Sequence, residues 1–431
     1  MFARILTIWQ WIRTSLWALP LLMVLCAIGT AIVILNVPFE AGGDPVWWLY
    51  SGSGKEAPNF LSDLVAAMIT MGTLVISITM VVLTLAAQQL GPRLILAFMA
   101  DRKTQVAIGL FVSTIVYLLL VLRSVYGRGD VPNLAVTTGT VLVLMSVIAL
   151  PLFVHHLARA IVADTVIARV GRALDASMRA LLPAETALEV APERLRRHTG
   201  AMLRLDHGGY IQAIDYGRLI ACAKEWNATI ELGHRAGQHL IAGAVVARIA
   251  PPPRDHERVQ KTVNAAVLIG PERTPVQDIE YSLWQLVEVA LRALSPGIND
   301  PHTAVACIDR LGRSLGLMMR RGPAPQVWRD DEGIVRVIGP ASTFEGVVDA
   351  AFNEIRQIGC HYPAILIRLA ETLSQLAEQA TPLHRKVLAT HLKLIGETGR
   401  RTLDSPYDLE TLDDRVARGM DHLEAQSAHT P

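Results

Sequence analysis

The chain has 431 residues, and its 40 lysines and arginines almost balance its 39 aspartates and glutamates. This balance gives no reason to expect a nucleic-acid partner, because nucleic-acid-binding proteins usually carry a clear basic surplus. Hydrophobic residues make up 51% and charged residues only 18% of the chain, so it is more apolar than an ordinary soluble domain. The apolar excess lies in the first 157 residues, which indicates a membrane domain followed by a more polar region.

Four apolar segments are long enough to cross a bilayer, since a hydrocarbon core of about 30 Å needs about 20 helical residues. They are Leu16–Val37, Leu61–Leu90, Val106–Leu122 and Leu134–Val154. The first is too long for the apolar part of a typical signal peptide, and no small-x-small cleavage site follows it. We therefore predict a transmembrane domain of four helices over residues 1–157.

Lysine and arginine gather in alternate loops, which predicts the orientation of the spans. The N-terminal segment, the second loop and the stretch after the fourth span carry most of these cations. They are Arg4, Arg13, Arg93, Arg102, Lys103, Arg159, Arg169 and Arg172. By the positive-inside rule, both termini and the whole C-terminal half are expected in the cytoplasm, with the spans in a bacterial inner membrane.

A polar stripe runs along the second span. Its members recur at intervals of 3, 4, 7 and 4 residues, which places them on one face of a helix. They are Thr70, Thr73, Ser77, Thr84 and Gln88. One interpretation is a pore lining. The alternative is close helix packing with weak hydrogen bonds between helices. Spans two to four contain no ionisable residue in their interiors, which argues against proton-coupled transport and leaves passive permeation or no transport.

The polar half is expected to be an α+β cytoplasmic region with a small β-module and a C-terminal helical part. We assign residues 158–200 to a helical connector and linker, 201–258 to a β-barrel-like module and 259–431 to an α+β to helical domain. Within the module, Gly237 and Gly243 suit corners with positive φ. A prosthetic group carried by this module would need an attachment lysine. The only lysine between 201 and 260 is Lys224, which lies in a helix-like segment, so no carried prosthetic group or other cofactor is expected.

Several later elements have clear boundaries in the sequence. Residues 263–270 are strand-like, and Thr274 followed by Pro275 is the expected start of the next helix. Residues 326–339 predict a hairpin with a glycine in its turn. From about 343 to 426 the chain is predicted to be helical, with breaks before Pro363, Pro382 and Pro406.

The segment "ALRALSPGINDPHTAVACIDRL" contains two helix breakers followed by a helix start. Asp300 fits an N-cap with Pro301 at the first helical position, and Asn299 tolerates the left-handed region. A helix N-terminus also attracts anions. Asn299, Asp300 and His302 are therefore candidates for a ligand or subunit contact, and a plain capped corner is the alternative.

No catalytic motif and no metal-ligand spacing occurs in the sequence, so we expect no enzyme activity and no metal site. The four cysteines are Cys26, Cys222, Cys307 and Cys360, and none is spaced as in a zinc site. We expect them to be reduced thiols.

Long segments of the chain resemble a bacterial family of predicted membrane proteins, domain of unknown function 2254. The similar segments are residues 77–125, 155–170, 208–215 and 272–311. The resemblance implies the four-span topology and brings no catalytic residues. The sequence leaves two hypotheses: a homo-oligomeric passive channel for ions or small solutes, lined by the second span, or a membrane-anchored sensor or scaffold with a cytoplasmic ligand or protein partner.

Overall fold

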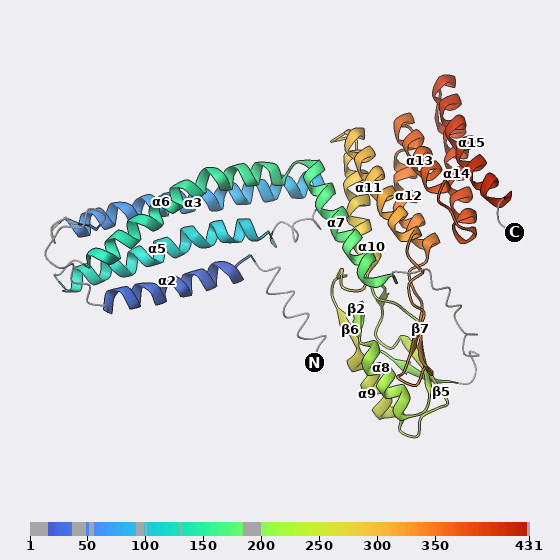
Figure 1. Cartoon of the computed structure of the whole chain (residues 1–431), viewed down its shortest axis with the longest axis horizontal. Coiled ribbons are helices and arrows are strands. Elements are labelled where there is room, and N and C mark those ends of the chain that lie inside the picture. Colours follow the sequence, from blue (N-terminus) through green and yellow to red (C-terminus); the bar gives the residue numbers. More distant parts are fainter. Residues whose placement is uncertain are drawn as a thin grey trace. The chain divides into compact units, whose positions relative to one another are not determined.

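The structure is a computed structural model that describes residues 16–36, 49–50, 56–91, 99, 101–128, 132–183 and 200–428. The chain divides into two compact units, Met1–Thr165 and Val166–Pro431 (Figure 1). The first is a helical bundle, and the second combines small sheets with a stack of helices. This arrangement confirms the predicted fold class.

In the described part of the first unit, four helices are long and apolar enough to cross a membrane. They are α2 (Ala18–Asn36), α3 (Ala57–Leu90), α5 (Arg102–Arg128) and α6 (Asn133–Ala160) (Figure 1). The central helix is α5, which packs against α2, α3 and α6. The four predicted spans are thus confirmed, although α5 is longer than the segment expected from hydropathy alone.

Glycines allow α5 to approach its neighbours closely. A Cβ at Gly109 would lie 3.2 Å from the Cα of Pro20 on α2, and a Cβ at Gly139 on α6 would lie 2.8 Å from the side chain of Leu118. Small residues at such contacts are typical of membrane helices, where dispersion replaces the hydrophobic effect as the main attraction.

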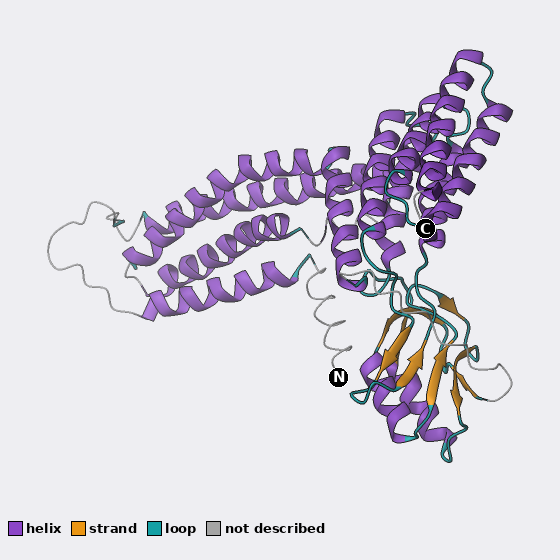
Figure 2. Ribbon diagram, turned by 45° about the vertical axis from the view of Figure 1, so that its right-hand side comes forward, coloured by secondary structure: helices purple, strands orange, loops and turns teal. Residues whose placement is uncertain are grey.

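The strands of the second unit form two sheets (Figure 2). The larger has the order β1-β5-β3-β8-β7, and only its β3–β8 pair is parallel; the smaller has the order β4-β2-β6. The strands are β1 (Ala201–Arg204), β2 (Gly209–Ile214), β3 (Thr229–Leu232), β4 (His239–Leu240), β5 (Val245–Ala250), β6 (Val267–Gly270), β7 (Val327–Arg329) and β8 (Val335–Ile338).

Two helices, α8 (Tyr216–Glu225) and α9 (His256–Ala266), pack against the sheets. The shared core includes Leu203, Ile230, Ile249, Val259 and Val337, each without exposed surface. The structure differs from the expected barrel-like module in two ways: the strands form two sheets instead of one barrel, and three of them lie beyond residue 258. Residues 263–266 also end helix α9, so the expected strand begins only at Val267.

The remaining helices stack as three successive hairpins (Figure 1). Helix α12 packs against both α10 and α14, and helix α13 packs against both α11 and α15. This is the arrangement of an α-solenoid. The helices are α10 (Ile279–Ala293), α11 (Pro301–Met319), α12 (Phe344–Ile358), α13 (Pro363–Ala377), α14 (Pro382–Thr402) and α15 (Pro406–Ala428).

Helix α7 (Ala163–Leu181) follows α6 and is fastened to α11. Arg310 Nη2 lies 2.7 Å from Asp175 Oδ2, and the Ser314 hydroxyl donates to the other carboxylate oxygen at 2.8 Å. A Cβ at Gly171 would overlap the guanidinium of Arg310. Gly171 therefore leaves the space that this partly buried ion pair requires.

Candidate functional site

The polar stripe of α3 lies on the exposed side of the helix. Its five members, Thr70, Thr73, Ser77, Thr84 and Gln88, are all exposed. The buried face of α3 carries Met68, Val75 and Ala86. Ser77 is nine residues from both Met68 and Ala86, which is about two and a half turns. The stripe is therefore opposite the buried face, on the side of α3 that is exposed in a single copy.

The threonine hydroxyls of the stripe bond to the backbone of their own helix. Thr70, Thr73 and Thr84 each donate to the carbonyl four residues earlier, at 3.0, 2.9 and 2.9 Å. These bonds use the hydroxyl protons, so each oxygen turns its remaining acceptor capacity outward. The stripe can thus lie against lipid at little cost, and it can also present a row of acceptors to water or a cation.

Hydroxyls inside the bundle are paired with one another or with the backbone. Thr114 on α5 lies 3.4 Å from Ser146 on α6, and the Tyr117 hydroxyl donates to the carbonyl of Ala135 at 3.1 Å. The side chains of Thr114, Tyr117 and Ser146 have no exposed surface. The interior of a single bundle is therefore packed at these positions, whereas the stripe on α3 presents its polar side chains on the outside of the bundle.

The Asn299–His302 segment is a capped corner. Asp300 Oδ1 accepts from the Thr303 backbone N–H at 3.1 Å, and its Oδ2 accepts from the Thr303 hydroxyl at 2.6 Å. The hydroxyl bond is the main cause that lowers the pKa of Asp300 below its usual value. Asn299 has a φ of 50° and accepts from the Tyr362 hydroxyl at 3.0 Å, while His302 is exposed. Hydrogen bonds within the chain account for Asn299 and Asp300.

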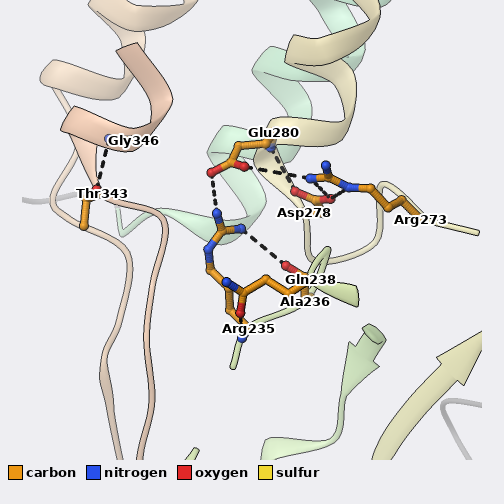
Figure 3. A network of polar contacts seen from close by, with 8 residues as sticks. All are labelled: Arg235, Ala236, Gln238, Arg273, Asp278, Glu280, Thr343 and Gly346. Carbon is orange, nitrogen blue, oxygen red and sulfur yellow. Dashed lines mark hydrogen bonds and ion pairs between the residues drawn. The ribbon is translucent and has the colours of Figure 1, made fainter. Parts of the chain in front are cut away.

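A buried polar network joins the smaller sheet to α10 (Figure 3). Asp278, which has no exposed surface, caps α10 and lies 2.6 Å from Arg273 Nη2. Beside it, Glu280 Oε1 is 2.5 Å from Arg235 Nη2, an arginine from the loop between β3 and β4. A Cβ at Gly237, whose φ is 89°, would overlap the Asp278 carboxylate. Backbone and carboxylate thus fit together only with glycine at this position.

Sequence reasoning missed this network. It placed the start of α10 at Thr274, whereas the hydroxyl of Thr274 donates to the carbonyl of Gln212 at 3.1 Å and the helix begins at Ile279. Arg235 is 45 residues from Glu280, so no local pattern relates them. The one available signal was an aspartate, Asp278, directly before an amphipathic segment, which is an N-cap as favourable as threonine.

A cavity of about 440 Å³ lies on the larger sheet. Strands β3, β5 and β8 line it, together with the loop that leads to α12. Its polar lining includes Glu231, Arg248, Gln326 and Thr343. The volume falls in the range of small-molecule sites, and its wall carries one charge of each sign, Glu231 and Arg248, which are directly opposite each other on β3 and β5.

The comparisons with known proteins agree with the membrane unit. The family model described as "Predicted membrane protein (DUF2254)" matches residues 13–375. The chain belongs to the DUF2254 family. It is also 28% identical over 445 residues to uncharacterized proteins of Mycobacterium bovis and Mycobacterium tuberculosis H37Rv, covering all of this chain and 85% of each relative. No solved structure matches the chain significantly. This member of DUF2254 is thus a predicted membrane protein with four apolar helices.

Proposed function

We propose that this DUF2254 protein is a homo-oligomer in the bacterial inner membrane, in which α3 helices from several copies line a passive pore for ions or small solutes. The single observation that carries the proposal is the position of the hydroxyl residues of the stripe, which lie opposite the buried face of α3 and are exposed in a single copy; they are Thr70, Thr73, Ser77 and Thr84. A surface of this kind faces either lipid or another copy.

The dimensions of the stripe fit a membrane-spanning path. From Thr70 to Gln88 the helix rises about 27 Å, at about 1.5 Å per residue, close to the thickness of a hydrocarbon core. Closed symmetry would repeat the stripe around a central axis and convert single hydroxyls into rings. Rings of weak oxygen acceptors hydrate a cation without holding it tightly, which suits conduction.

The second unit would then serve as the assembly or gating domain, on the cytoplasmic side with both chain termini. Its first helix, α7, directly follows the fourth span in the chain, which supports this role. The partly buried Arg310–Asp175 pair couples α7 to α11, so a movement of the helical stack would be transmitted to α7. In this proposal the protein catalyses no reaction and needs no cofactor.

The test is the reactivity of cysteines placed along α3 after the four native cysteines have been replaced. In the oligomer, Thr73→Cys, Ser77→Cys and Thr84→Cys should react with a water-soluble thiol reagent. Leu144→Cys and Ile148→Cys on α6 are the matched controls, because these side chains are 57% and 64% exposed and should face lipid. Reconstituted protein should also release small ions from liposomes, and reaction at Ser77→Cys should reduce that flux.

Equal protection of the α3 and α6 cysteines, in protein that stays folded and oligomeric, would contradict the pore. The stripe would then be a lipid-facing surface, with its threonine hydroxyls satisfied by the backbone of their own helix.

A sensor function is the second candidate, and the cavity on the larger sheet favours it. A small ligand with both charge signs should raise the melting temperature of the full chain. Glu231→Ala together with Arg248→Ala should abolish the increase, while Lys224→Ala, outside the cavity lining, should keep it.

A further inference from the structure

A hydrogen bond between Asp101 and His156 holds the start of α5 against the end of α6. Asp101, directly before α5, contacts Nε2 of His156, and it also accepts from the Thr104 hydroxyl at 3.1 Å. The Asp101 and His156 side chains are only 18% and 21% exposed. Because the two helices are fixed to each other at this point, the residues beside Asp101 and beside His156 lie at the same level of the bilayer.

Exposed basic side chains surround this contact. Arg102 and Lys103 follow Asp101, and His155 and Arg159 flank His156; all four are exposed. Their side chains form no ion pair with any residue in the described ranges. The neighbouring carboxylate of Asp101 is engaged by His156 and Thr104. Three fixed positive charges and an imidazole therefore face outward at the same end of the bundle.

Exposed apolar side chains continue from these cations toward the bilayer centre. Val106 follows Arg102 by four residues, so it lies on the same face of α5, and it is 46% exposed. Leu152 precedes Arg159 by seven residues on the same face of α6 and is 65% exposed. On both helices a cation is thus located above an apolar surface. A phospholipid has the same order, with its phosphate above its acyl chains.

We propose that this edge of α5 and α6 binds an anionic phospholipid, with its headgroup between Arg102, Lys103 and Arg159 and its acyl chains along Val106 and Leu152. The charge selects an anionic over a zwitterionic headgroup. The apolar continuation requires a lipid and excludes a free phosphate. This site lies on other helices than the α3 stripe, so it does not depend on whether the protein conducts.

The experiment measures binding of a fluorescent phosphatidylglycerol to the purified full chain in a neutral detergent, with phosphatidylcholine as the competing lipid. A cation near a membrane surface contributes roughly a fivefold factor to binding of an anionic lipid, so Arg102→Gln with Lys103→Gln should weaken binding about 30-fold. Arg159→Gln should weaken it about fivefold on the same basis. Binding to the unmodified protein should decrease at high salt.

Arg123→Gln is the matched control, because Arg123 is an exposed cation toward the other end of the same helix. It should bind phosphatidylglycerol like the unmodified protein. Melting temperatures in phosphatidylcholine should be equal for all variants, which separates loss of the site from loss of the fold. An equal loss with Arg123→Gln would show attraction to net charge and overturn the proposal. Displacement of the lipid by inorganic phosphate at low millimolar concentration would overturn it as well.

Discussion

Two glycines six residues apart allow the buried network at α10 to be tested quantitatively. Gly237 and Gly243 both have positive φ, 89° and 81°, but only Gly237 touches the network. Nothing lies within 4 Å of a Cβ built at Gly243. Gly243→Ala should therefore destabilise the fold only through its backbone, by about 1–2 kcal/mol. Gly237→Ala carries the same backbone cost and also displaces the Asp278 carboxylate from Arg273.

A buried charge that loses its partner costs about 3–5 kcal/mol. For a unit of this size, each kcal/mol shifts the melting temperature by about 2–4 °C, so Gly237→Ala should melt about 6–20 °C below Gly243→Ala. The assay is thermal unfolding of the full chain in detergent, followed by tryptophan fluorescence. If the two variants melt at the same temperature, the Asp278–Arg273 contact does not stabilise the second unit and the reasoning is refuted.

Three further predictions concern the second unit. Asp300→Asn should keep most of the stability, since asparagine caps as well, whereas Asp300→Ala should cost about 0.5–2 kcal/mol in thermal unfolding; abolished flux or ligand binding in both, at an unchanged melting temperature, would reveal a ligand role. Burial lowers the pKa of His391 in the folded chain. As the pH falls, this histidine is therefore protonated in the unfolded chain before it is protonated in the folded chain, and the stability of the fold should decrease below about pH 6.5. The stability of His391→Gln should depend less on pH than the stability of His302→Gln. An equal dependence of stability on pH in the two variants would contradict the prediction. Gly171→Leu should displace Arg310 and speed hydrogen exchange in α7, which unaltered exchange would disprove.

The sequence predicted best the elements whose boundaries depend on local chemistry. Pro363, Pro382 and Pro406 each begin a helix, because proline fixes φ and has no N–H to donate. The Asp300 cap and the left-handed φ of Asn299 are also confirmed, because both depend on the chemistry of the residue itself. The four apolar helices follow from length and hydropathy. The orientation of the spans and the pore lining remain predictions, because they depend on a bilayer and on other copies.

Contacts between distant residues escaped prediction. The parallel pair of β3 and β8 joins Ile230 to Val337, and a stretch of more than 100 residues with its own helices separates them. Hydrophobic alternation marks each strand but does not select its partner. Asp101 and His156 are likewise 55 residues apart. Only the packed structure shows that His156 joins two spans.

The stack of helical hairpins has a consequence for how the second unit opens. In such a stack each hairpin is stabilised mainly by its neighbours, so stability can differ from one hairpin to the next. The α10 end is fastened to the smaller sheet through Asp278 and Glu280, whereas α15 packs chiefly against α13 and α14. Opening should therefore start at α15 and advance one hairpin at a time toward α10. Amide exchange should record this as protection that declines toward the C-terminus, which leaves the hairpin farthest from the sheets as the easiest part of the molecule for a binding partner to remodel.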